Sequence, residues 1–170
     1  MNKLILIATM IMTCGVTFGQ FIDDPVIATS QLYINGIDQK SGLTVKCTYW
    51  NTLHWEGIEN TQLIQIVCVD GNRWVLYLGM GNSGYVEEGM KYQIMFSDMS
   101  IISLPCIQTG SLGYGKAMYR INDSDLQKLR TKPIVQVIAM YAQDNGCTYS
   151  AVSNLLIDES DLIMRLLRLF

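Results

Sequence analysis

Aromatic side chains that could hold a ligand gather in one short stretch of the chain, where Tyr49, Trp50 and Trp55 lie within seven residues. Tryptophan faces exposed on a rigid sheet edge stack on sugar rings or anchor a protein interface. The alternative is that Trp50 and Trp55 cover one end of the core, which is the more common role of large aromatic side chains. These three residues are the candidate ligand surface.

Acid–base chemistry has few candidates. His54 is the only histidine, so a nucleophilic Ser or Cys would depend on it for a base. It falls in a predicted strand end and loop, without a nucleophile motif. Two carboxylates can hydrolyse glycosides without histidine. Four glutamates in predicted loops could form such a pair: Glu56, Glu59, Glu87 and Glu88. Loop acids are usually only solvated, so we expect a non-catalytic protein and keep a carboxylate-dependent hydrolase as the alternative.

Cofactor and metal motifs are weak. Residues 79–84, Gly-Met-Gly-Asn-Ser-Gly, match a dinucleotide-binding glycine pattern. A strand pattern follows them where that motif requires a helix, so we interpret them as a flexible connection. Asp70-Gly71-Asn72 lacks the spaced ligands of an EF-hand loop. No two cysteines have metal-knuckle spacing. We therefore expect no cofactor and no metal.

The N-terminal residues predict export. Residues 1–19 have the order of a secretory signal peptide: Lys3 comes first, an apolar run follows over 4–12, and small residues form the exit at 17–19. Cleavage after Gly19 leaves Gln20 as the first mature residue. We expect a periplasmic or extracellular protein with no transmembrane segment after cleavage, since no later apolar run is long enough to span a bilayer.

A lipid anchor on Cys14 is the alternative, although Thr13 stands where a lipobox carries Gly, Ala or Ser. The mature residues 20–170 are expected to form one domain. Loss of Lys3 from the 12 basic residues leaves 11 against 15 acidic ones, a formal charge of −4. No basic block could follow a phosphate backbone, so nucleic acid is not an expected partner.

Four cysteines remain after cleavage, and an oxidising compartment lets disulfides persist. They are Cys47, Cys68, Cys106 and Cys147. Three pairings exist, and the predicted one joins Cys47 to Cys68 and Cys106 to Cys147, because Cys47 and Cys68 lie in predicted strands. Buried free thiols are the alternative.

The elements that position these residues are mainly strands. Residues 43–50 alternate in a strand pattern. Val45, Cys47 and Tyr49 share one face, and Lys46 and then Trp50 share the other, which is the candidate solvent face. Residues 61–69 and 73–79 flank Asp70-Gly71-Asn72 and predict a hairpin. Residues 91–97 and 100–104 predict another, and Pro105 is expected to end its second strand. These strands together predict an antiparallel meander.

The last third predicts two helices. Residues 121–126 and 157–162 repeat a helix-start pattern, in which Asn122 or Asp158 would cap the first free amides. Pro133 limits the first helix, and residues 134–141 predict a strand. The second helix is expected to run toward Phe170. The fold class is therefore α+β, an antiparallel meander with a short helix and a C-terminal helix packed against it.

Two stretches carry a resemblance: Phe18-Gly19-Gln20 at the predicted cleavage site, and the strand Tyr119–Asn122, which leads into Asp125-Leu126. In these stretches the chain resembles short exported β-rich proteins of Gram-negative bacteria. That resemblance implies export and no assigned activity. We expect a non-catalytic module that binds a protein or a glycan. The alternatives are the hydrolase described above and a structural or assembly component at the cell surface, which would keep an unpaired strand edge or an apolar patch for its partner.

Overall fold

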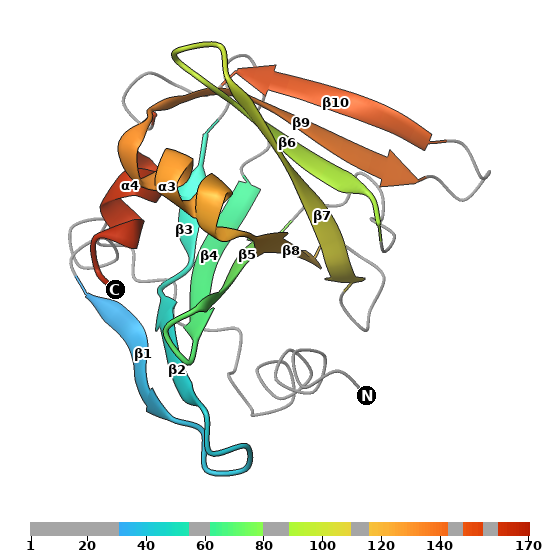
Figure 1. The fold of residues 1–170 in the computed structure, drawn as a ribbon. Helices are drawn as coiled ribbons and strands as arrows, with labels where there is room; N and C mark the ends of the chain where they lie inside the picture. The colour runs from blue at the N-terminus through green and yellow to red at the C-terminus, as the bar shows by residue number, and fades with distance from the viewer. Residues whose placement is uncertain (1–30, 55–61, 80–88, 110–115, 143–147, 155–159) are drawn as a thin grey trace.

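The computed structural model describes residues 31–54, 62–79, 89–109, 116–142, 148–154 and 160–170 (Figure 1). The predicted signal peptide, Trp55, Cys147 and the four loop glutamates lie outside these residues. The predicted α+β fold, an antiparallel meander-like sheet with two short helices, is confirmed. Among the described residues, no helix has the length and apolar character needed to cross a membrane.

Ten strands form one sheet in the described part of the chain, in the order β1-β2-β4-β5-β8-β7-β6-β9-β10, with β3 also paired to β4. All pairs are antiparallel. The strands are β1 (Leu32–Ile37), β2 (Thr44–Thr48), β3 (Asn51–Leu53), β4 (Gln62–Val69), β5 (Arg73–Gly79), β6 (Lys91–Phe96), β7 (Ile101–Thr109), β8 (Lys116–Ile121), β9 (Ile134–Ala142) and β10 (Thr148–Asn154). The sequence patterns did not predict β1, β3 or β10.

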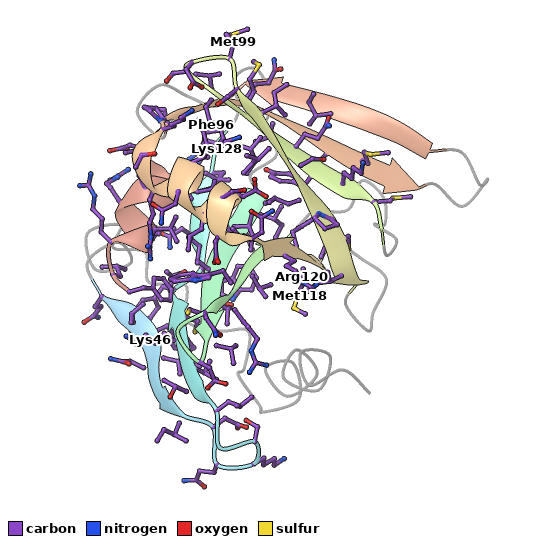
Figure 2. The ribbon with its side chains drawn as sticks, viewed as in Figure 1. Lys46, Phe96, Met99, Met118, Arg120 and Lys128 are labelled. Atoms are coloured by element: carbon purple, nitrogen blue, oxygen red, sulfur yellow. The ribbon has the colours of Figure 1, made fainter. Side chains whose placement is uncertain are left out.

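The two predicted hairpins are confirmed. Asp70 and Gly71 both have positive φ, 51° and 71°, which is what a type I′ turn between β4 and β5 requires. Asn72 N closes that turn on Val69 O at 3.3 Å. At the tip of the β6–β7 turn, Met99 has φ 67° and its side chain is exposed (Figure 2).

The order of the strands differs from a simple meander at two places, because β5 pairs with β8 and β6 pairs with β9. The long strand β7 joins the two halves, since its first part pairs with β6 and its last part with β8. Pro105 was predicted to end this strand, and that prediction is wrong. Cys106 N donates to Met90 O on the β6 side at 2.7 Å, so the Pro105 nitrogen points the other way. Pairing with β8 begins only at Cys106, so the missing amide costs no ladder hydrogen bond.

Helices α3 (Asp123–Thr131) and α4 (Leu162–Leu167) pack against each other on one side of the curved sheet (Figure 1). The Asn122 side chain caps α3 as predicted, accepting from Asp125 N at 2.8 Å. The predicted second helix is too long. It begins after Asp161, which makes no side-chain cap and instead pairs with Arg165, and it ends at Leu167. Asp158 lies outside the described residues.

Both faces of the central strands are buried. The main core lies between the two halves of the sheet and the helices, and includes Ile66 and Leu76, which are fully buried. The opposite face of β2, β4, β5 and β8 carries a second group of buried side chains, which we call the second cluster. Its members are Val45, Cys47, Val67, Val69, Val75 and Met118.

Candidate functional site

A two-residue break between β2 and β3 positions the aromatic pair Tyr49–Trp50. Thr48 ends β2 and is fully buried, and its Oγ1 accepts from Ile66 N on β4 at 3.0 Å. Gln65 Nε2 donates to Thr48 O at 2.8 Å. These side chains supply the hydrogen bonds that the interrupted ladder lacks. Tyr49 and Trp50 therefore leave the strand before pairing resumes at Asn51.

The break also changes the face on which Trp50 lies. The prediction that Trp50 shares the Lys46 face is wrong, because Trp50 packs against the second cluster together with Tyr33 and Ile34. The alternation that predicted its face ends with β2 at Thr48. Trp50 is half-buried, so part of its surface packs within the protein and part faces solvent.

Tyr49 extends toward the edge strand β1. Its ring lies 5.0 Å from the ring of Tyr33, centroid to centroid, with the planes at 56°. Such a tilted pair is a favourable aromatic arrangement. The structure therefore brings Tyr49 and Trp50 together with β1, a strand that the sequence patterns missed. The third predicted aromatic, Trp55, lies outside the described residues.

Strand β1 presents an open edge over Asn35–Ile37. Asp38 N donates to Leu43 O at 2.9 Å, and hydrogen-bonded pairs alternate along an antiparallel ladder. The main-chain groups of Asn35 and Ile37 therefore point away from β2. Within the described residues β1 pairs only with β2. We call Asn35, Gly36 and Ile37, with the Tyr33–Tyr49 pair beside them, the β1 edge.

The β1 edge is poorly protected against another strand. Proteins usually protect edge strands with charged side chains, proline or bulges. The sequence of β1, Leu-Tyr-Ile-Asn-Gly-Ile, contains neither charge nor proline. Its one irregularity lies between Leu32 and Ile34, before the exposed part. Ile37 is 70% exposed, and a Cβ built on Gly36 would meet nothing within 4 Å. No second described strand lies alongside this edge.

The described cysteines do not form the predicted Cys47–Cys68 bridge. The register sets Cys47 opposite Val67 and Cys68 opposite Lys46, so the two thiols point to opposite faces of the sheet. Both are free and buried, Cys47 in the second cluster and Cys68 in the main core. Burial raises the pKa of the Cys47 thiol to about 12. The Cys106–Cys147 bridge stays a prediction, because Cys147 lies outside the described residues.

The described carboxylates serve local turns and helix ends. Hydrogen bonds from Ser41 lower the pKa of Asp38, and hydrogen bonds from Lys132 and then Ser100 hold the pKa of Asp98 well below its usual range. Three other carboxylates are engaged in the same local way: Asp70 with Arg73, Asp125 with Asn122, and Asp161 with Arg165.

In the described ranges, no three His, Cys, Asp or Glu side chains lie close enough together to hold a metal ion. His54 is exposed, directly after β3, as the sequence predicted. The four glutamates proposed for a hydrolase, Glu56, Glu59, Glu87 and Glu88, lie outside the described residues.

Comparison of the chain with protein-family models, with curated proteins and with solved structures finds no match in any of the three.

Proposed function

We propose that this protein is an exported, non-catalytic module that binds an extended segment of a protein partner at the β1 edge. The observation that carries the proposal is the uncharged edge itself, where Asn35 and Ile37 direct main-chain donors and acceptors away from the sheet. Main-chain pairing supplies affinity when a peptide adds a strand to a sheet edge.

Side chains beside the edge favour a protein over a glycan. Tyr33 and Tyr49 form an aromatic pair next to it, and exposed Ile37 offers an apolar contact. Trp50 is partly covered by its packing on the second cluster, which leaves less of its ring for stacking on a sugar.

Export is part of this proposal and rests on the signal-peptide pattern of residues 1–19. The compartment is then the periplasm or the exterior. A structural or assembly role would use the same edge, with another copy of the chain as the partner.

A matched pair of variants tests strand addition. The probe is a library of random twelve-residue peptides displayed on phage, selected on the wild-type protein. Ile37→Pro removes one outward N–H and no β1–β2 hydrogen bond, whereas Ile37→Ala keeps the N–H and removes the exposed side chain. We expect selected peptides to bind Ile37→Pro about tenfold or more weaker, by calorimetry, and to lose less affinity for Ile37→Ala.

Unfolding in urea provides the control, since both variants should unfold near the wild-type midpoint. Equal affinity of the selected peptides for the wild type and Ile37→Pro would contradict strand addition. Self-association of the wild type that Ile37→Pro abolishes, without any peptide binding, would instead support the assembly role.

A further inference from the structure

Gly36 lies in the middle of the β1 edge, although neither its backbone nor its neighbours require a glycine. Its φ lies outside the left-handed region that favours glycine, and a Cβ built on it would meet nothing within 4 Å. The pairing of β1 with β2 is regular over 34–37, so Gly36 marks no bulge. A glycine inside a strand weakens that strand, because it offers no side chain to pack. The property for which a glycine is suited here is the close approach of another chain.

The register determines how Gly36 would meet an added strand. Gly36 pairs with Val45 and directs its own N–H and C=O toward β2, because the outward main-chain groups belong to Asn35 and Ile37. We take the added strand as antiparallel, like every described pair of the sheet. The residue opposite Gly36 then forms a non-hydrogen-bonded pair with it, in which the Cα atoms lie about 4.5 Å apart and side chains are closest.

The side chain opposite Gly36 would project from the face of the sheet that carries the second cluster. Residues paired in register share a face, and Gly36 is paired with Val45 as Ile34 is paired with Cys47. Val45 and Cys47 belong to the second cluster, and Ile34 packs against it. The side chain opposite Gly36 therefore has Ile34 as a diagonal neighbour and Val45 one strand further. Its surroundings are apolar, and the missing side chain of Gly36 does not separate it from Val45.

We propose that Gly36 selects partner segments that carry an aromatic residue opposite it. This inference rests on the proposed strand addition at the β1 edge and names the chemistry of the partner. An aromatic ring opposite an edge glycine lies over its main chain and stabilises the pairing. Aromatic side chains also reach diagonal neighbours, here Ile34, at about 7–8 Å. A ring does so with two rotatable bonds, so ordering it costs less entropy than ordering a long flexible side chain.

The peptides selected on the wild-type full chain provide the probe. Each aromatic residue of a selected peptide is replaced by alanine, one at a time, and calorimetry gives the ratio of the two dissociation constants. We expect one aromatic position at which this ratio is about tenfold on the wild-type protein. Gly36→Val places a β-branched side chain where the ring would lie, so the ratio at that position should fall below about twofold. Valine favours strands, so Gly36→Val should unfold in urea at a midpoint no lower than that of the wild type.

Thr44→Val is the matched control, because it places the same side chain at an exposed position of β2, outside the β1 edge, and should leave the ratio at about tenfold. Selected peptides that lack an aromatic residue, or an unchanged ratio on Gly36→Val, would overturn the selection by Gly36. Strand addition would still stand in that case, provided that Ile37→Pro weakens the binding of the same peptides. If Ile37→Pro binds them as tightly as the wild type does, strand addition fails, and this inference fails with it.

Discussion

Thr48 decides where the aromatic side chains of the candidate site lie. Its hydroxyl oxygen replaces a backbone acceptor for Ile66 N at the point where the chain leaves β2. Its carbonyl accepts from Gln65 Nε2, so both polar groups of the break are satisfied in a buried place. The path of Tyr49 and Trp50 therefore depends on one hydroxyl group and one amide.

Thr48→Val should show this dependence. The substitution keeps the shape and leaves Ile66 N without its acceptor, which costs about 1–3 kcal/mol in a buried site. The free energy of unfolding in urea measures the loss. Thr52→Val is the control, because Thr52 is half-buried one strand further along. A loss at Thr48 no larger than at Thr52 would mean that the hydroxyl does not support the break.

The two helices differ in how they begin, although their start sequences repeat. Asn122 accepts from Asp125 N at 2.8 Å and donates to Asp125 Oδ2 at 2.7 Å, so it stabilises the first turn of α3 through both groups. Asp161 stands at the same place before α4 and makes no side-chain cap. Its partner is Arg165, at 3.1 Å, in a half-exposed ion pair.

Alanine substitutions at the two positions should therefore differ. Asn122→Ala should lower the free energy of unfolding by about 1 kcal/mol, as the loss of an N-cap does. Asp161→Ala should cost less than about 0.5 kcal/mol, because exposed i,i+4 pairs contribute little. Urea unfolding of both variants under one condition measures the difference. Asn122→Asp retains the capping oxygen and should recover most of the loss. Equal losses at Asn122 and Asp161 would contradict the assigned roles.

Elements with local signals could be predicted from the sequence. The β4–β5 hairpin follows from its Asp-Gly turn, and α3 follows from its cap at Asn122 and its stop at Pro133. Strand β10, Thr-Tyr-Ser-Ala-Val-Ser-Asn, has a mixed polar pattern without clear alternation, and it is held by its pairing with β9, the strand directly before it in the chain.

The candidate site was only partly predictable, because its geometry depends on contacts between separate parts of the chain. Residue type alone singles out Tyr49 and Trp50. Their final positions depend on the contact of Thr48 with Ile66 and on the neighbouring strand β1, and neither leaves a local pattern. The effect of Pro105 likewise depends on which neighbour β7 pairs with at that residue, and a local pattern does not encode that neighbour. Pairing between separate parts of the chain therefore determines the positions of these residues, and local sequence patterns do not predict it.

At the scale of the whole molecule, the sheet separates two apolar layers and ends in β1 and β10 within the described chain. The main core and its helices stabilise one face. The second cluster lies on the other face, and within the described residues the β1 edge pairs only with β2. The fold therefore assigns separate places to the two apolar clusters and to the proposed partner.

Strand addition at the β1 edge is tested by hydrogen–deuterium exchange at single amides, measured on the wild-type protein with and without a saturating selected peptide. We expect the amides of Asn35 and Ile37 to exchange more slowly when the peptide is bound, because they gain main-chain acceptors. The amides of β10 should not change. Protection confined to residues outside β1, with Asn35 and Ile37 unaffected, would contradict binding by strand addition at the β1 edge.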